Sequence, residues 1–249
     1  MDDQNHDFCK DWLVSLTCEE RMVPDALILH SQWIDHQDLS LWRALLGAKA
    51  STPDWNTVTG DFLGRRIAFA HVFGPSMVAA TMYPWAMRGS GLFIHTGYAN
   101  RLRRDTCPGS ILIAESAYAE SVTESAVFHA APELVDQAVY FCEQSGYPYR
   151  VGTVISASAL PSAEEGHWRK WEKENLDGVD METASVFSLA SRLGKKSISL
   201  LNMAGLAACM ASETKQLSDE IMNTDRRIRE LSLHLAASQV KQEPTDADG

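Results

Sequence analysis

The chain has 249 residues, of which 45% are hydrophobic and 22% are charged, a composition typical of one large globular domain. Asp and Glu number 33 against 22 Lys and Arg, and the resulting net charge of −11 argues against nucleic-acid and anionic-membrane partners. No apolar run approaches the roughly 20 residues that cross a bilayer, and the acidic N-terminus does not resemble a secretion signal. The five cysteines are scattered, which is typical of reduced thiols in a cytoplasmic protein.

Strand and helix patterns alternate along most of the chain. We expect a polar N-terminal arm over residues 1–23, one domain over 24–238 and a disordered acidic tail over 239–249. Short apolar runs predict strands at residues 26–30, 64–73, 91–96, 110–114, 151–156 and 198–201. Helical patterns and end signals predict helices at residues 39–46, 76–83, 132–146, 181–194 and 218–237. This order predicts an α/β fold, a three-layer sandwich around a central mixed and mostly parallel sheet, with ligands at the carboxyl ends of its strands.

The segment Gly178-Val-Asp-Met-Glu-Thr-Ala-Ser-Val-Phe187 carries the most chemical information. It places two carboxylates, Asp180 and Glu182, around Met181 where a strand or loop turns into a helix. An ionised carboxylate only accepts hydrogen bonds, so it suits a vicinal diol such as that of ribose. Acidic residues at a helix start also stabilise the helix dipole without any ligand. Spacing alone therefore leaves both interpretations open.

The order of residues in this segment resembles the V-E-M-E-A-A signature of the purine nucleoside and uridine phosphorylase family, which also contains nucleosidases. Other segments resemble family motifs in the same order along the chain: Phe73-Gly-Pro-Ser76, Phe93–Asn100 followed by Pro108–Ala114, and Val151–Ser158. The resemblance covers about residues 24–237. It implies a nucleoside phosphorylase-like fold, a nucleoside-like small-molecule substrate, and a homo-oligomer (dimer, trimer or hexamer) whose subunits complete each other's sites. It calls for no cofactor, and the Cys and Met residues show no metal-ligand spacing.

The same resemblance assigns the binding residues. Met181 and Glu182 would hold the ribose beside Asp180, while Ser158 and Leu160 fall near the base. Phosphorylases of the family bind phosphate through three arginines and a Ser or Thr. This chain has His30–Asp35, Pro53, His95 and Tyr98 at those places, so His95 and Tyr98 would occupy the former phosphate pocket. Phosphorolysis is therefore disfavoured, because a dianion needs charged, directional donors.

Three further positions are candidates for the reaction itself. Asp35 falls near the Glu with which family nucleosidases activate water, although a surface Asp is an equal alternative. The Asp that serves purine-cleaving members is replaced here, and nearby Asn202 can hydrogen-bond a base without protonating it. His71 ends a strand, as His95 does, and both are expected to point toward the site, as a base, a phosphate surrogate or a structural histidine.

The sequence thus predicts cleavage of the N-glycosidic bond of a nucleoside or modified nucleoside, with Asp35 and Glu182 as the catalytic pair and water favoured over phosphate as acceptor. Two alternatives remain open. The altered residues also fit a family member that acts on a non-nucleoside metabolite. They equally fit a non-catalytic, small-molecule-binding partner of an active paralogue.

Overall fold

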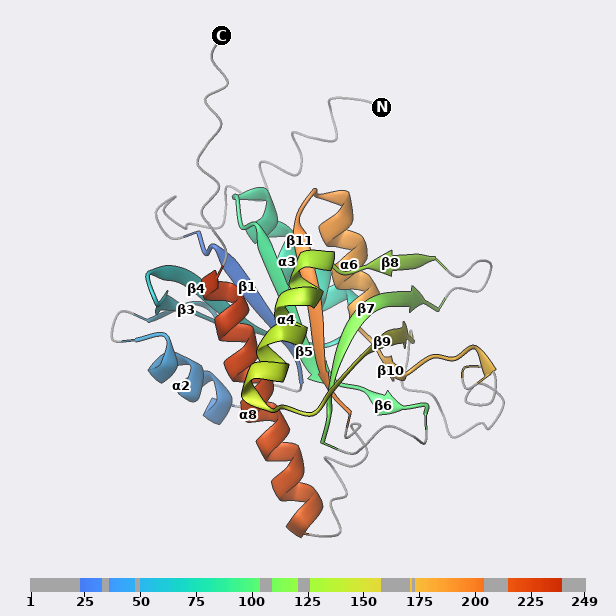
Figure 1. The fold of residues 1–249 in the computed structure, drawn as a ribbon. Helices are drawn as coiled ribbons and strands as arrows, with labels where there is room; N and C mark the ends of the chain where they lie inside the picture. The colour runs from blue at the N-terminus through green and yellow to red at the C-terminus, as the bar shows by residue number, and fades with distance from the viewer. Residues whose placement is uncertain are drawn as a thin grey trace, which may run out of the picture.

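A mixed β-sheet of 11 strands forms the centre of the molecule (Figure 1). The computed structural model describes residues 23–32, 36–47, 50–103, 109–120, 126–157, 171, 173–203 and 215–238. The predicted tail, nearly all of the predicted arm, and Asp35, Ser158 and Leu160 lie outside these residues.

The strands follow the order β2-β3-β4-β1-β5-β11-β7-β9-β10-β6, and β8 pairs with β7. The centre is parallel, as predicted: β4, β1, β5 and β11 run side by side, and so do β7, β9 and β10. Antiparallel pairs join β2 to β3, β3 to β4, β11 to β7, β7 to β8 and β10 to β6. The strand bounds are β1 Ala26–Ser31, β2 Ser51–Asp54, β3 Thr57–Phe62, β4 Arg65–Val72, β5 Leu92–Tyr98, β6 Asn100–Arg101, β7 Ile111–Ala119, β8 Val127–His129, β9 Tyr149–Ser156, β10 Gly178–Asp180 and β11 Lys196–Asn202.

Helices cover both faces of the sheet, which confirms the predicted three-layer arrangement (Figure 1). On one face, α3 (Gly74–Met87) and α6 (Thr183–Arg192) bury Met82 and Phe187 against the strands. On the other face, α2 (His36–Leu45), α4 (Pro132–Ser145) and α8 (Lys215–Ser238) bury Trp42, Leu134 and Leu231. We call these the α3/α6 face and the α2/α8 face. Among the described helices, none combines the length and the apolar character that a membrane span requires.

The start and end of α6 follow from its sequence. Val186, Phe187 and Ala190 are buried along one side, as the spacing of apolar residues predicts. Gly194 follows the helix with φ of +62°, a conformation that glycine adopts without strain, and the N–H of Lys195 donates to the carbonyl of Ala190. At its other end, the helix begins directly after Glu182, just beyond the carboxyl end of β10.

Alternation along the strands divides their polar ends between the two faces. In β1, Leu29 belongs to the core under α3 and α6, whereas Ile28 belongs to the core under α2 and α8. Ser31 therefore faces α3 and α6, and His30 faces the opposite way. In β5, Phe93 and Ile94 divide in the same manner, so His95 and Ser31 share a face. This alternation decides which candidate residues meet.

Candidate functional site

Asp180 is the last residue of β10, and its carboxylate lies inside a ring of hydrogen-bond donors. The hydroxyl of Ser156 donates to Oδ1 at 2.5 Å, and the backbone N–H of Thr183 donates to Oδ2 at 2.9 Å. The Thr183 hydroxyl donates to Oδ2 as well. Burial raises the pKa of Asp180, while these donors act in the opposite direction because they favour the ionised form.

Glu182 occupies the N-cap position of α6, two residues beyond Asp180, and only 5% of the residue is exposed. Its Oε1 accepts the backbone N–H of Gly74 at 2.7 Å, and Gly74 has φ of +75° at the start of α3. Burial, followed by the negative charge of Asp180, raises the pKa of Glu182 to about 7. This contact gives the Phe73-Gly-Pro-Ser76 motif a role, because its Gly74 N–H binds the Glu182 carboxyl although the two residues lie far apart in the sequence.

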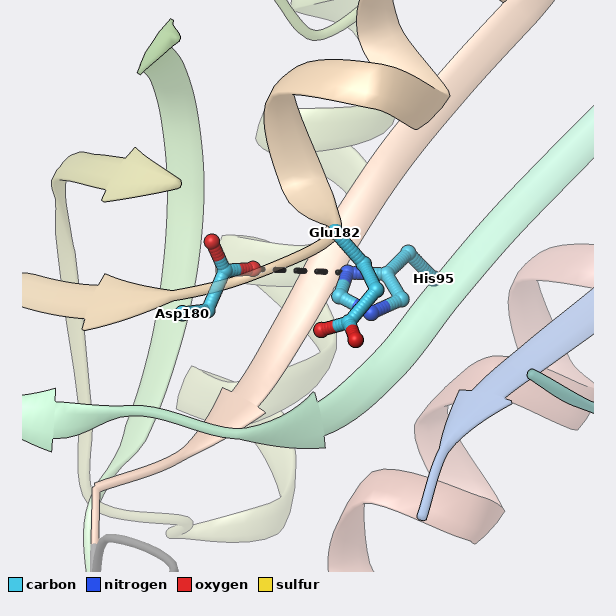
Figure 2. A group of neighbouring side chains, drawn as sticks. All are labelled: His95, Asp180 and Glu182. Atoms are coloured by element: carbon cyan, nitrogen blue, oxygen red, sulfur yellow. Dashed lines mark ion pairs between the residues drawn. The ribbon is translucent and has the colours of Figure 1, made fainter. Parts of the chain in front are cut away.

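His95 of β5 lies beside the carboxyl groups of Asp180 and Glu182 (Figure 2). Its Nε2 lies 2.6 Å from the hydroxyl oxygen of Ser31, and its Nδ1 lies 2.8 Å from that of Ser199. Nδ1 also lies 3.1 Å from the hydroxyl oxygen of Thr183 and 4.0 Å from Oδ2 of Asp180. Burial, followed by the charge of His30, lowers the pKa of His95 to about 3. The imidazole is therefore neutral at physiological pH.

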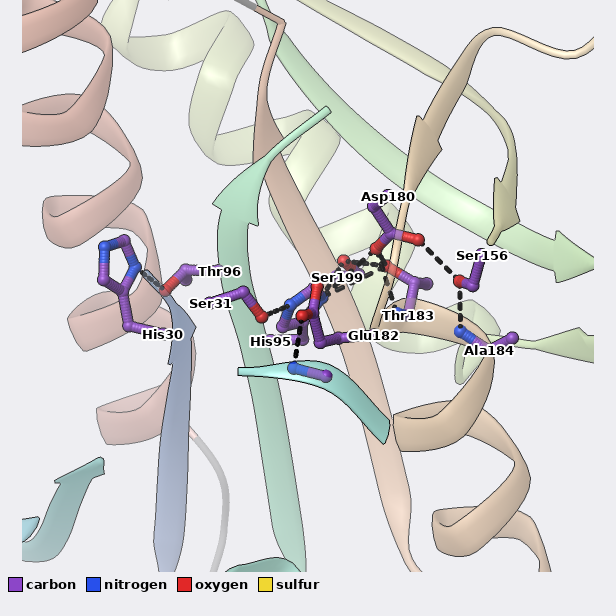
Figure 3. A network of polar contacts seen from close by, with 11 residues as sticks. His30, Ser31, His95, Thr96, Ser156, Asp180, Glu182, Thr183, Ala184 and Ser199 are labelled. Atoms are coloured by element: carbon purple, nitrogen blue, oxygen red, sulfur yellow. Dashed lines mark hydrogen bonds and ion pairs between the residues drawn. The ribbon is translucent and has the colours of Figure 1, made fainter. Parts of the chain in front are cut away.

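His95, Asp180 and Glu182 each offer one atom of a metal-ligand type, and these atoms lie within 4.8 Å of one another. In this structure the same atoms face protein groups instead. Both ring nitrogens of His95 meet hydroxyl oxygens, and Asp180 accepts hydrogen bonds from Ser156 and Thr183. A metal ion would have to displace these contacts, so we describe the cluster as a hydrogen-bond network (Figure 3).

The other predicted histidine lies on the opposite side of the sheet. His71 is fully buried on the α2/α8 face, where its Nε2 lies 3.6 Å from Oδ2 of Asp38. The expectation that His71 and His95 point the same way was wrong. The pairing explains the difference, because His71 stands beside His30 in the sheet whereas His95 stands beside Leu29.

Tyr98 and Asn202 also lie on the α2/α8 face, where both contact Asp225 of α8. The Tyr98 hydroxyl donates to Oδ2 of Asp225 at 2.7 Å, and the Asn202 amide donates to Oδ1 at 2.8 Å. The Asn202 amide also donates to the backbone carbonyl of Ile221 at 3.1 Å. A pocket of about 450 Å³ lies between the strand ends, α2 and α8, and its lining includes His30, Trp42, Thr96, Tyr98, Asp225 and Arg229.

Comparison with known proteins assigns the chain to a family. The profile described as "Phosphorylase superfamily" matches residues 44–240, most of the chain. The chain belongs to the phosphorylase superfamily. Curated relatives include a DeoD-type purine nucleoside phosphorylase of Clostridium perfringens, 25% identical over 72% of this chain and 78% of its own length. A DeoD-type 2 enzyme of Photobacterium profundum is 27% identical over 66% of this chain and 75% of its own length.

Solved structures confirm the nucleoside phosphorylase-like fold. A uridine phosphorylase of Vibrio fischeri superimposes with a TM-score of 0.75 at 21% identity, covering 90% of this chain and 96% of the other. A 5'-methylthioadenosine/S-adenosyl homocysteine nucleosidase of Campylobacter jejuni gives 0.69 at 15% identity, covering 87% and 100%. The family predicted from the sequence is therefore confirmed, and with it the expectation of an enzyme-like chain.

Within this member of the phosphorylase superfamily, the structure unites only part of the predicted site. Asp180, Glu182 and His95 form one cluster, with half-buried Met181 between the two acids in the chain. His71, Tyr98 and Asn202 lie across the sheet from that cluster. Sequence reasoning missed the hydroxyl groups of Ser31, Thr183 and Ser199. Ser199 pairs with His95, and Ser31 lies two residues beyond Leu29, which also pairs with His95. This register between strands cannot be read from the sequence, so no signal singled out these hydroxyl groups.

Proposed function

We propose that this chain cleaves the N-glycosidic bond of a nucleoside or modified nucleoside, with water as the acceptor. Membership of the phosphorylase superfamily supports the bond that is cleaved, because the matched relatives are nucleoside phosphorylases. Met181 and Glu182 at the end of β10 would hold the sugar, with the Glu182 carboxylate accepting hydrogen bonds from two adjacent hydroxyl groups.

One observation carries the choice of water: the neutral, enclosed imidazole of His95. The family resemblance puts a phosphate-binding arginine at this position, and phosphate recognition depends on such cations. His95 has a pKa of about 3 and both its ring nitrogens face protein hydroxyls. Two carboxyl groups, those of Asp180 and Glu182, lie beside it. A phosphate dianion would meet negative charge here and no compensating cation from His95.

The remaining roles stay predictions. In an oxocarbenium-like reaction, Asp35 would activate the attacking water, and Ser158 and Leu160 would lie near the base. Asn202 would contact the base only if it turned away from Asp225, which its amide now contacts at 2.8 Å. We also propose that the chain acts in the cytoplasm as a homo-oligomer, with a nucleoside-like small molecule as its partner.

The test is to incubate the protein with a panel of nucleosides, with and without phosphate, and to measure free base by chromatography. Base release that does not depend on phosphate, and that is lost in Glu182→Ala, is the expected result. Glu133→Ala is the matched control, because Glu133 is half exposed and pairs with Lys196 on the surface of α4. Release that requires phosphate would contradict hydrolysis. No release from any nucleoside would instead favour a non-nucleoside substrate or a non-catalytic partner role.

A further inference from the structure

The pocket between α2, α8 and the ends of β1 and β5 lies across the sheet from Glu182, and the proposed function gives it no ligand. Its volume of about 450 Å³ falls within the roughly 300–1,000 Å³ that small-molecule sites occupy. Figure 3 shows two of its lining residues, His30 and Thr96, away from His95 and Glu182. We call it the α2/α8 pocket. A ligand in it would bind apart from the proposed nucleoside site.

Three side chains give the α2/α8 pocket its charge: Asp38 from the first turn of α2, and Asp225 and Arg229 from α8. Nη2 of Arg229 lies 3.8 Å from Oδ1 of Asp38, and the same positive charge also acts on Asp225. One arginine therefore serves two carboxylates. The three groups together leave an excess of one negative charge, which a ligand with a positive group would balance.

His30 also lines the pocket, but its ring nitrogens contact other residues of the protein. Nδ1 lies 2.9 Å from the hydroxyl oxygen of Thr96, and Nε2 lies 2.9 Å from Oε1 of Gln32. The ring therefore leaves no N–H for an anionic ligand. Among the lining residues, Arg229 is the only side chain with a permanent positive charge, and it lies near both carboxylates. An anion in this pocket would meet more repulsion than attraction.

Asp225 lacks full compensation for the cost of its burial. The Tyr98 hydroxyl donates to Oδ2 and the Asn202 amide donates to Oδ1, and both donors are neutral. Burial raises the pKa of Asp225, because these donors and the charges of His30 and Arg229 offset the loss of hydration only in part. Each carboxylate oxygen has two lone pairs, so the side chain can accept further hydrogen bonds. An ammonium group would supply both donors and the missing charge.

Apolar side chains of both helices flank these charged groups. Leu41 of α2 and Met222 of α8 line the pocket with 39% and 59% of the residue exposed. Trp42 and Ile228 belong to the lining as well, but both are buried. Exposed apolar surface of this kind contributes to binding when an apolar part of a ligand covers it. The lining therefore suits a molecule that joins a positive group to an apolar body.

We propose that the α2/α8 pocket binds a small organic cation, a primary amine with an apolar body, whose ammonium group contacts the Asp225 carboxylate. This binding is separate from the proposed hold of Glu182 on the sugar, and neither depends on the other. Arg229 opposes it, because the guanidinium lies near both carboxylates and repels the ammonium group.

The test is isothermal titration calorimetry of the full chain with 2-phenylethylamine, in the absence of any nucleoside. Two probes of similar size but different charge are compared with it: neutral 2-phenylethanol and anionic 3-phenylpropionate. The amine should bind about tenfold or more tightly than either, the scale of one hydrogen bond to a charged group. Absence of binding by the amine, or binding no tighter than that of the other two probes, overturns the proposal.

Two variants with opposite expected effects locate the amine. Asp225→Asn keeps the shape of the side chain but removes its charge, so the affinity for the amine should fall about tenfold or more. Arg229→Gln removes the repelling charge, so the affinity should rise about two- to fivefold, the scale of a partly exposed charge pair. The second variant keeps the proposal testable if the first does not fold. Affinity that does not fall in the first, or does not rise in the second, overturns the proposal.

Glu230→Gln is the matched control, because Glu230 is another carboxylate of α8 beside an arginine, with Nη1 of Arg226 3.3 Å from its Oε1, and it does not line the pocket. It should leave the affinity for the amine unchanged. Glu182→Ala separates this proposal from the proposed function, since base release is expected to be lost in it while amine binding is kept. Loss of amine binding in Glu182→Ala would assign the amine to the sugar site and overturn the proposal.

Discussion

Gly97 faces Ser31 across the β1–β5 pair so closely that a Cβ on residue 97 would stand 3.0 Å from Cβ of Ser31. The backbone of β5 can therefore approach the end of β1, where Ser31 forms a hydrogen bond with His95. Glycine is needed here for space, since its φ is not in the left-handed region.

We predict that Gly97→Ala destabilises the protein by about 1–3 kcal/mol, the usual cost of overpacking a close contact. The added methyl group pushes Ser31 away from His95 and weakens the 2.6 Å contact between them. Gly91→Ala is the control, because a Cβ at residue 91, just before β5, meets nothing within 4 Å. Urea unfolding of both variants measures the effect, and an equal loss in the two would refute the steric explanation.

Glu182 should reduce stability at alkaline pH. A carboxyl group whose pKa rises from 4.5 to about 7 on folding binds its proton more tightly in the folded state. Stability is then full below the unfolded pKa and falls as pH rises through the folded pKa. Glu182→Gln, which does not ionise, is expected to be more stable than the wild type by about 2–3 kcal/mol at pH 8.5. The advantage should vanish near pH 4, and denaturant midpoints at both pH values check this.

His95 has the opposite effect, at acidic pH. Its pKa falls from 6.5 to about 3 on folding, so the unfolded chain binds a proton that the folded chain refuses. The stabilising contribution of neutral His95 to the free energy of unfolding is therefore complete above pH 6.5. It is lost as pH falls toward 3, by about 3–5 kcal/mol in all. His95→Gln should flatten the dependence of unfolding free energy on pH in this window. Parallel curves for the variant and the wild type would show that His95 is not the group responsible.

Substrate affinity should rise with pH if Glu182 holds the sugar. Hydroxyl donors favour the ionised carboxylate, and a group of pKa about 7 is mostly protonated at pH 6 and mostly ionised at pH 8. KM for a cleaved nucleoside is therefore expected to fall about tenfold between these values. Steady-state kinetics across this range provide the measurement. Equilibrium binding of the nucleoside to Glu182→Ala should be weak and should not depend on pH in this way. A flat KM in the wild type would count against sugar binding by ionised Glu182.

Long apolar strands and amphipathic helices could be predicted from the sequence because their burial leaves a strong pattern. The predicted helix at 132–146 and strand at 26–30 match α4 and β1 to within one residue. The β2–β3 hairpin was missed, since Ser51–Asp54 contains a proline and β3 contains a glycine, both poor strand formers. Strands β6 and β10 have only two and three residues, too few for any period to show.

The site was predictable where chemistry and chain order coincide. Asp180 and Glu182 lie within one short segment, so one motif found both. The hydrogen bond from Gly74 to Glu182 spans 108 positions, and only the packing of α3 against α6 creates it. His71 was misplaced because a strand end indicates the edge of the sheet that a side chain occupies. The face depends on register, which sequence alone does not provide.

The division of β1 between its two faces sets a rule for how this segment can vary in evolution. His30 contacts Thr96 beside the pocket, and Ser31 contacts His95 on the opposite face of the sheet. One residue inserted between Ala26 and Leu29 would move His30 into the place of Ser31, near His95, and would put Leu29 beside Thr96. Length changes within this strand should therefore be selected against, whereas a substitution at His30 can alter the pocket while Ser31 keeps its place.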